Sequence, residues 1–401
     1  MFVLGFALLL GLLAGLTRPF EEPYPVDLDA PYALLHYGQH VSGTFYPTGY
    51  QTIVLAGLAL AGRRGVMLVQ VLTYMGLVGS AYAALRLLLI PAGRAAVGAV
   101  LVGLDPQFLI AINRIVDLNA VAPLLIALVS VSLWIRRDGF SWVRALLLGL
   151  TVGGLFAVRP NLVSVVPVAI VLVWHQIRWP QVVLAIVATP IPILVTSSIM
   201  LGHPALPTNA AYTFAQGANS YSETELLHNY NAELSLNHYL GHFKVSKLPD
   251  LQAPSKQGPL VSFGLNWIKD HPAQYVKLIG IKLYTLLRPD LRPRTNRVPL
   301  SKFERLVEIL SALPVVIWLI AVALARRRRV STAPLSTRIV VLFVALYLFP
   351  FVLTNGDPRL GYPVDTVLLL QTAAIFGRWR KKSESPSGQV NEPTLSGVHS
   401  T

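Results

Sequence analysis

The sequence predicts an all-α protein whose helices cross a membrane about ten times. Three observations support this prediction. Hydrophobic residues make up 54% of the 401-residue chain and charged residues only 13%, whereas about 25% of residues are charged in a soluble domain. Long apolar runs recur along the whole chain, which has a mean hydropathy of +0.57. The basic residues gather in short clusters beside these runs, as is typical of the cytoplasmic ends of membrane-spanning helices.

The net charge of +14 would suggest a nucleic-acid partner in a soluble protein. Here the basic clusters lie at the ends of apolar runs, so membrane topology explains the charge and no nucleic-acid partner is expected. The clusters are Arg63-Arg64, Arg136-Arg137, Arg326–Arg329 and Arg378–Lys382. The sequence contains no cysteine, which excludes disulfides and thiolate metal sites.

Ten apolar runs are candidates for crossing the bilayer. They are 1–16, 66–85, 95–112, 119–135, 142–158, 161–177, 181–201, 306–325, 338–354 and 363–377. The first run has neither a basic start nor a small-residue cleavage site. We therefore expect it to be a retained span of a plasma-membrane protein, not a removed signal peptide.

The apolar segment 50–62 is about as long as an interfacial or re-entrant helix. When Arg136-Arg137 is placed in the cytoplasm, the downstream basic clusters also lie in the cytoplasm. Counting spans backward from Arg136 places the start of 66–85 outside, and counting from the N-terminus places 17–49 outside. The two counts are consistent only if 50–62 does not cross the membrane. We therefore expect a juxtamembrane or re-entrant helix, within a first extracytoplasmic loop over 17–65. The alternative is a true crossing at 50–62 and one false span later in the chain.

A large extracytoplasmic loop is expected over 202–305. In its second half, apolar residues recur near helical spacing with lysines between them, which predicts an amphipathic helix over 263–288 on the outer membrane surface. Lys269, Lys277 and Lys282 would bind anionic headgroups of membrane lipids on this surface.

The C-terminal tail, 378–401, is rich in Ser, Pro and Gly and is predicted to be disordered in the cytoplasm. Residues 1–377 would then form a single transmembrane domain. The sequence contains no internal repeat and no glycine-rich phosphate-binding loop.

Acidic residues and arginines gather near span ends on the predicted outer side. They are Asp27, Asp29, Asp117, Asp357 and Asp365, with Arg159 and Arg359. Ionisable residues at membrane depth are costly and indicate function. Such a set suits glycosyl transfer, in which a carboxylate removes the proton of an acceptor hydroxyl and guanidinium groups bind the departing phosphate. A lipid-linked donor would explain why the site lies in a membrane.

The first loop resembles that of a known family. The stretch "DLDAPYALLHYGQHVSGTFYPTGYQTIV" is similar to the first-loop signature of the GT-C membrane glycosyltransferases, which include protein O-mannosyltransferases and aminoarabinose-transferase-like enzymes. In that signature an acid and then a tyrosine precede a P-x-G-Y/P turn. Asp29 with Tyr32 matches the D-x-x-Y spacing better than Asp27 does. The resemblance therefore implies that Asp29 is the base, with Asp27 beside it.

Four later stretches resemble the same family in the same order, over most of 1–377. "LDPQFLIAINRIVDLNA" ends in an outward acid, Asp117, and "GLFAVRPNLVSVVP" contains an Arg-Pro turn at Arg159. "KDHPAQYVKLIGIKLYTLLRP" resembles the family's outer interfacial helix, with His271 at its start. "DPRLGYPVDTVLLL" resembles its late R-Y-x-x-P turn, with the difference that Leu360 and Gly361 separate Arg359 from Tyr362 here.

The resemblance implies a GT-C-type bundle and an inverting transfer of a sugar from a polyprenyl-phosphate-linked donor. The acceptor would be a glycan, lipid or protein of the cell envelope, met on the periplasmic or extracellular side. The residues implied to bind substrate are Tyr32, Asp117, Arg159, His271, Arg359 and Tyr362.

Plainer roles stay open for each of these residues. Asp29 is also placed to cap a helix beginning near Pro31, and Asp117 to stop a helix. Arg159 is also suited to extend from a span end toward the membrane surface, and His271 to start the amphipathic helix.

No cofactor is required by the sequence, but two histidine pairs at helical spacing keep a divalent metal open. They are His36 with His40 and His238 with His242. Two other functions also stay open. One is a transporter or flippase of lipid-linked glycans, and the other is a non-catalytic scaffold subunit of an envelope-assembly complex.

Overall fold

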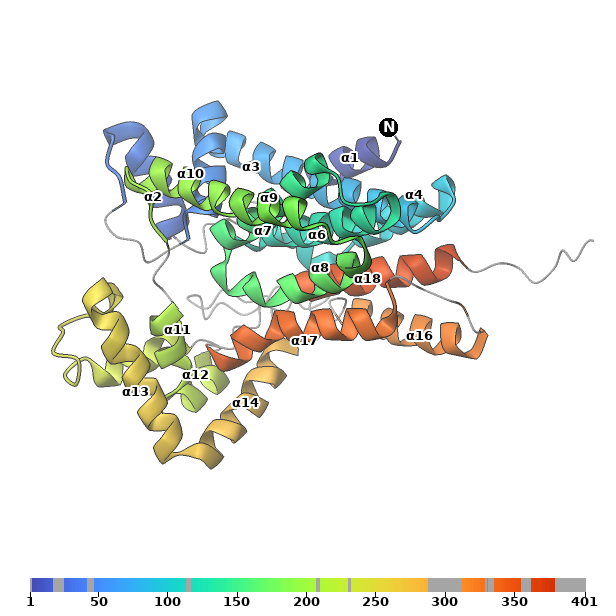
Figure 1. Cartoon of the computed structure of the whole chain (residues 1–401). Coiled ribbons are helices and arrows are strands. Elements are labelled where there is room, and N and C mark those ends of the chain that lie inside the picture. Colours follow the sequence, from blue (N-terminus) through green and yellow to red (C-terminus); the bar gives the residue numbers. More distant parts are fainter. Residues whose placement is uncertain are drawn as a thin grey trace, which may run out of the picture.

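The computed structural model describes residues 2–16, 25–41, 47–112, 117–206, 210–229, 232–287, 310, 312–328, 330, 335–354 and 362–378. All regular secondary structure within these residues is helical, which confirms the predicted all-α class. Most helices run roughly side by side in one bundle, and a smaller group of helices lies apart at one corner (Figure 1).

The bundle is built from long apolar helices and short connecting turns. Its elements are α1 (Phe2–Leu16), α2 (Pro25–Tyr37), α3 (Thr48–Leu87), α4 (Ala92–Gly103), α5 (Pro106–Ala111), α6 (Leu118–Asp138), α7 (Trp142–Val158), η1 (Pro160–Val165), α8 (Val166–Val173), η2 (Trp174–Gln176), α9 (Trp179–Ala188), α10 (Pro190–Leu201), α16 (Leu313–Arg328), α17 (Thr337–Leu353) and α18 (Tyr362–Gly377). Three helical segments in the described part of the chain are long and apolar enough to cross a membrane, namely Thr48–Leu87, Asn119–Asp138 and Trp179–Leu201.

The predicted continuous span over 95–112 is wrong. Helix α4 ends at Gly103, and α5 begins at Pro106 after a short break. The physical reason is the pair Asp105-Pro106, because a proline disfavours helical backbone in the residue before it. Asp105 is almost fully buried in this break, and its carbonyl accepts a 3.1 Å hydrogen bond from the Leu109 amide.

Prolines change the hydrogen bonding in two later spans that the sequence predicted. The run 161–177 begins and ends in 3-10 turns, on either side of α8. In the run 181–201, α9 and α10 meet at Thr189, whose backbone stays helical, so Trp179–Leu201 is one helical segment. Pro190 removes a backbone donor from this segment without ending it.

Helix α3 changes direction at the end of 50–62, the segment for which the sequence allowed either a membrane crossing or a re-entrant helix. Ala61 and Gly62 leave the helical conformation, and Gly62 takes a φ of +58° that favours glycine. Gly57 then packs on Gly65, and the Gln70 amide donates a 3.0 Å hydrogen bond to the Tyr50 hydroxyl. The first part of α3 therefore folds back along the second, as a juxtamembrane or re-entrant segment would. Its depth in the bilayer stays a prediction.

The group apart from the bundle, which we call the cap, occupies residues 210–287. It contains α11 (Ala210–Gly217), α12 (Ser222–Asn229), η3 (Ala232–Tyr239), η4 (Leu248–Gln252), η5 (Pro254–Lys256), α13 (Gln257–Asp270) and α14 (Pro272–Leu287). The cap has two small apolar cores of its own. The amphipathic helix predicted over 263–288 is in fact two helices meeting at His271, because Pro272 cannot continue α13.

The bundle has two chemically different ends. At one, which we call the acidic end, α4, α7, α10 and α17 finish and α6 and α18 begin, and this end carries Asp105, Asp117, Arg159 and Asp365. At the other, the arginine end, α3, α6, α16 and α18 finish and α4, α7, α9 and α17 begin. The first-loop helix α2 and the cap lie toward the acidic end in Figure 1. The acidic end is therefore the place to look for a site.

Candidate functional site

An ion pair at the acidic end joins two of the residues that the sequence singled out. Arg159 Nε lies 2.5 Å from Asp117 Oδ2, and Arg159 Nη2 donates a 3.0 Å hydrogen bond to Asp117 Oδ1. The side chains keep 22% and 25% of their exposure, so the pair is neither buried away nor free in solvent. Such a two-point contact fixes the plane of a guanidinium group.

Local sequence explains how these side chains meet. Pro160 follows Arg159 and holds it in extended conformation, with φ −149° and ψ 99°, which ends α7 at Val158. Asp117 directly precedes α6, and its carbonyl accepts a 3.0 Å hydrogen bond from the Ala120 amide. Because α6 and α7 are neighbouring antiparallel helices, the start of one lies beside the end of the other.

Helix α17 completes the site with aromatic side chains that the sequence reasoning missed. The Arg159 guanidinium lies 5.9 Å from the centre of the Phe351 ring. Tyr347, one turn earlier, is fully buried with its ring 5.3 Å from that of Phe351. The Tyr347 hydroxyl has no hydrogen-bond partner among the described residues. Phe343, Tyr347 and Phe351 repeat every four residues, and this repeat was the available signal.

Two further carboxyl groups are buried at this end. Asp105 keeps 1% of its exposure in the α4–α5 break, and Asp365 keeps 7% in the first turn of α18. The sequence reasoning placed Asp365 among the outer acids but missed Asp105, because it read 95–112 as one uninterrupted span.

The first loop approaches the ion pair through its last residues. Gly49 packs so closely on α7 that an added Cβ would lie 2.6 Å from the carbonyl carbon of Ala157. The Thr48 hydroxyl donates a 3.1 Å hydrogen bond to the Thr196 hydroxyl of α10. The beginning of α3 therefore lies against the last turn before Arg159, where only glycine fits.

The predicted base lies on α2, earlier in the same loop. Asp29 is exposed, and no hydrogen bond or ion pair joins it to Arg159 among the described residues. Tyr32 keeps 45% of its exposure and packs against His36, with ring centres 4.2 Å apart. The side chain of Asp27 lies outside the described residues. The structure thus pairs Arg159 with Asp117 and leaves Asp29 open to solvent.

His271 lies between α13 and α14. The corner at which these two helices meet points away from α6 and α7 in Figure 1. His271 Nδ1 lies 3.1 Å from the Trp267 carbonyl, and its ring stacks on the Trp267 indole at 5.3 Å. These contacts give His271 a role in shaping the corner.

The prediction that three cap lysines face anionic headgroups is wrong for one of them. Lys282 is fully buried and donates a 2.7 Å hydrogen bond to the Gly217 carbonyl at the end of α11. Lys269 and Lys277 are exposed, and Lys277 forms a 2.7 Å ion pair with Glu223 of α12. Contact of these two lysines with headgroups stays a prediction. Helical periodicity does not show that α11 covers Lys282.

Lys282 joins the cap to the bundle. An added Cβ at Gly217 would overlap the Thr354 carbonyl oxygen just after α17, and Tyr275 of α14 donates a 3.4 Å hydrogen bond to the Leu353 carbonyl. The Lys282 ammonium thus lies where α11, α14 and the end of α17 meet. Burial lowers the pKa of Lys282 to about 7.

The remaining predicted residues either lie outside the described residues or form other contacts. Arg359 and the side chain of Tyr362 lie outside the described residues. His238 stacks on Tyr221, with ring centres 3.8 Å apart, while His242 contacts the Phe243 and Phe263 rings. Among the described residues, no group of three or more His, Asp or Glu side chains could hold a metal ion.

Comparison with known proteins gives a loose structural similarity. No protein-family model and no curated protein matches the sequence. The chain is similar to the crystal structure of ArnT from Cupriavidus metallidurans bound to undecaprenyl phosphate, with 14% sequence identity, a TM-score of 0.40, and coverage of 94% of this chain and 77% of that one. Both the identity and the TM-score are low, so the function proposed next rests on the residues of this chain.

Proposed function

We propose that this protein is a membrane glycosyltransferase of the GT-C type that takes its sugar from a polyprenyl-phosphate donor. The observation that carries the proposal is the Asp117–Arg159 pair at the acidic end of an apolar bundle, with Phe351 beside the guanidinium and the buried Tyr347 packed on Phe351. The ordered motifs of the first loop, the Asp117 stretch and the Arg159 turn support the same family. The acceptor, a glycan, lipid or protein, would approach from the aqueous side on which α2 and the cap lie.

Arg159 is suited to bind the phosphate of a lipid-linked donor. A guanidinium group is always charged and presents paired donors that match phosphate oxygens. Asp117 fixes the plane of the guanidinium group, and Phe351 packs against it, so the Arg159 side chain would lose little conformational entropy on binding. A polyprenyl tail would lie along the apolar helices while its phosphate met Arg159 at their ends.

Tyr347 is suited to donate a hydrogen bond to the same ligand. A buried polar group without a partner costs about 1–3 kcal/mol, so it calls for a physical explanation. A donor phosphate or sugar oxygen beside Arg159 would satisfy the hydroxyl. We expect Tyr347 to form this bond only when the donor is bound.

Asp29 remains our proposed base because of its exposure. An acceptor hydroxyl arriving from water would meet an open carboxylate on α2, whereas both oxygens of Asp117 already contact Arg159. The acceptor oxygen would form a bond to the sugar carbon while the bond from that carbon to the phosphate oxygen breaks. The hydroxyl proton would pass to Asp29, and the electron pair would leave on the phosphate beside Arg159. Attack opposite the leaving phosphate inverts the configuration of the sugar.

The test is sugar transfer by purified protein in liposomes containing radiolabelled polyprenyl-phosphate sugars. Replacing Asp29 with Asn should reduce the rate about 10²- to 10⁴-fold, the usual effect of losing a general base. Asp27→Asn is the matched control and should keep most of the activity.

Each other outcome points to a different function. Undiminished transfer by the Asp29→Asn variant would remove Asp29 as the base. Movement of a lipid-linked glycan across the bilayer without transfer would replace the proposal with a transporter. Neither transfer nor transport, with every donor tested, would favour a non-catalytic scaffold.

A further inference from the structure

We propose that the cap carries a binding platform for the glycan chain of the acceptor, formed by the stacked rings of Tyr221 and His238. That this glycan is the acceptor rests on the proposed function, because an acceptor would approach from the side on which the cap lies. Neither residue has a part in the transfer reaction itself. We call the two rings the ring platform.

The ring platform joins two segments of the cap at its surface. Tyr221 directly precedes α12 and His238 lies in η3, and their ring centres are 3.8 Å apart with an angle of 13° between the ring planes. Tyr239 packs against Tyr221 at a steep angle, with ring centres 5.7 Å apart. Tyr221 keeps 42% of its exposure, and His238 is also exposed. The stack covers one face of each ring, so the exposed area lies on the other faces and on the edges.

A buried polar network holds the ring platform in place. Asn219 Oδ1 accepts a 2.9 Å hydrogen bond from the Tyr221 amide, and Asn219 Nδ2 donates a 2.8 Å hydrogen bond to Ser235 Oγ of η3. The Ser235 hydroxyl donates in turn to the Gln216 carbonyl at 3.1 Å. Asn219 and Ser235 are both buried. The network therefore fixes the Tyr221 backbone against the element that carries His238, and a ligand would not have to order the rings.

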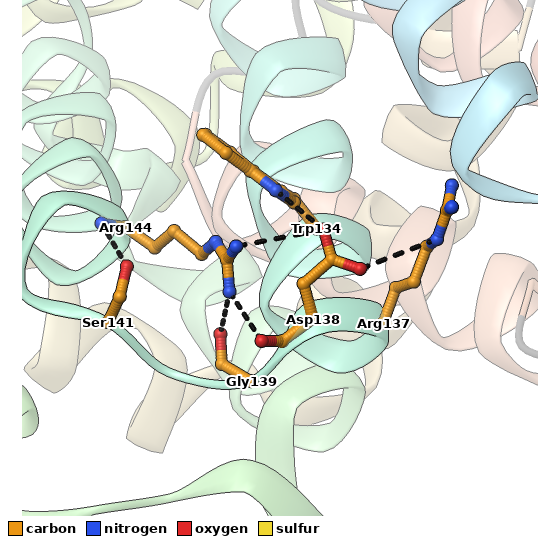
Figure 2. Close-up of polar contacts among 6 residues, drawn as sticks. All are labelled: Trp134, Arg137, Asp138, Gly139, Ser141 and Arg144. Carbon is orange, nitrogen blue, oxygen red and sulfur yellow. Dashed lines mark hydrogen bonds and ion pairs between the residues drawn. The ribbon is translucent and has the colours of Figure 1, made fainter.

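The polar atoms of the two rings are left for a ligand. Among the described residues, neither the Tyr221 hydroxyl nor a ring nitrogen of His238 has a hydrogen-bond partner. Trp134 at the arginine end shows the opposite arrangement. Its indole N–H donates a 3.0 Å hydrogen bond to Asp138, and the Arg144 guanidinium lies 4.8 Å from its ring centre and contacts the same carboxylate (Figure 2). The chain itself therefore occupies the polar atom of Trp134, whereas it leaves those of the ring platform open.

The charge around the ring platform favours a neutral ligand. The segment 202–243 contains no lysine or arginine, although the chain has 33 of them. Lys277 approaches this segment from α14 but is paired with Glu223 at 2.7 Å. Phosphate groups and anionic headgroups are bound mainly by arginine and lysine. The segment is rich instead in Asn, Tyr, His and Ser, whose side chains form hydrogen bonds with neutral polar groups.

A glycan matches these features. A sugar ring has a face of C–H groups, which stacks on an aromatic ring, and a rim of hydroxyl groups that both donate and accept hydrogen bonds. The exposed ring surface of Tyr221 and His238 would contact the C–H face. The Tyr221 hydroxyl and the His238 nitrogens would bond to hydroxyl groups of the rim. Tyrosine supplies a large contact area at a low cost in conformational entropy, which suits a preformed surface.

The experiment titrates the full-length protein in phosphatidylcholine nanodiscs with four neutral hexasaccharides, built from glucose, mannose, galactose or N-acetylglucosamine. Saturation-transfer NMR detects contact between the C–H groups of the sugar and the protein. We expect the wild-type protein to bind at least one of them, and Tyr221→Ala to weaken that binding about tenfold. His238→Ala should also weaken it, while Tyr221→Phe keeps the ring and should keep most of the affinity. Tyr284→Ala, at an exposed tyrosine of α14, is the matched control and should bind as the wild-type protein does.

Three outcomes would overturn the proposal. One is that the wild-type protein binds none of the four hexasaccharides. A second is that Tyr221→Ala and His238→Ala, shown to be folded by their unfolding temperatures, bind as tightly as the wild-type protein or lose no more affinity than Tyr284→Ala. The third is binding of an unglycosylated serine-rich peptide, without any hexasaccharide, that is lost in Tyr221→Ala, which would replace the glycan with a protein ligand. No donor lipid is present in these titrations, so failure here is distinct from failure of the proposed function.

Discussion

The two ends of the bundle use arginine in different ways. At the arginine end, guanidinium groups donate mainly to the carbonyls that finish α3, α6 and α18. At the acidic end, Arg159 instead meets the carboxylate of Asp117 and the ring of Phe351. In the first arrangement, a cation donates to the carbonyl groups at the C-terminal ends of helices, whose partial negative charge it complements. The second holds a cation in a fixed plane beside buried polar groups, which is how a ligand site is built.

The same contrast holds for burial. Asp105, Asp365 and Lys282 are nearly or fully buried near the acidic end, whereas Arg137 at the other end keeps half of its exposure. Burying ionisable groups is costly, so they indicate function more strongly than exposed ones do. This comparison suggests where substitutions should abolish activity and where they should do little.

The largest effect should follow from removing the Arg159 guanidinium. We expect Arg159→Gln to reduce sugar transfer about 10²- to 10³-fold, because it removes a group that stabilises the leaving phosphate. Arg137→Gln, at the other end, should leave transfer unchanged. Initial rates in liposomes measure both variants. If Arg159→Gln kept more than half of the wild-type rate, Arg159 would not be needed for transfer, and the proposed difference between the two ends would be wrong.

The next largest effect is the pH dependence of stability that arises from Lys282 in the cap. Because burial lowers the pKa of Lys282 to about 7, the unfolded protein holds more protons than the folded one above that pH. Stability should therefore rise from pH 7 toward about pH 10, by up to roughly 1.4 kcal/mol per pH unit, and be flat below pH 7. Thermal unfolding in detergent at several pH values measures this slope.

Two variants of α14 sharpen that measurement. Lys282→Met should abolish the slope, while Lys277→Met, which alters an exposed ion pair, should keep it. An unchanged slope in the Lys282→Met variant would mean that the pH dependence arises elsewhere.

A smaller effect should follow from Tyr347→Phe. The change removes only the hydroxyl, so we expect about a tenfold loss of transfer, as for a single lost hydrogen bond to the substrate, and no loss of stability. Tyr74→Phe is a contrasting control, because the Tyr74 hydroxyl donates a 2.7 Å bond to the Gly103 carbonyl. That variant should lose about 1 kcal/mol of stability. A similar loss for Tyr347→Phe would assign Tyr347 a structural role only.

The smallest effect is expected from Arg137→Gln on stability. Arg137 lies 3.4 Å from Asp138 and keeps half of its exposure, and exposed pairs contribute about 0–1 kcal/mol. We therefore expect less than about 0.5 kcal/mol in thermal unfolding. A loss of stability as large as that from Tyr74→Phe would show that Arg137 contributes more to stability than its exposure indicates.

The sequence by itself determined the class of the protein and the location of most helices, because apolar length and basic flanks are local properties of a chain. It also identified Asp117 and Arg159 as span-end charges. Where it failed, a single residue changed the local backbone, as Pro106 did within 95–112 and Pro272 did within 263–288.

The tertiary structure decided which groups meet. Asp117 and Arg159 are 42 residues apart, and Phe351 lies beside the Arg159 guanidinium from a helix much later in the chain. Periodicity shows which residues share a helix face but not what covers that face, so Lys282 looked exposed in sequence and is buried by the end of α11. Partners are chosen by packing between distant helices, and that choice separates a charge that orients the protein in the membrane from one that is placed to bind a ligand.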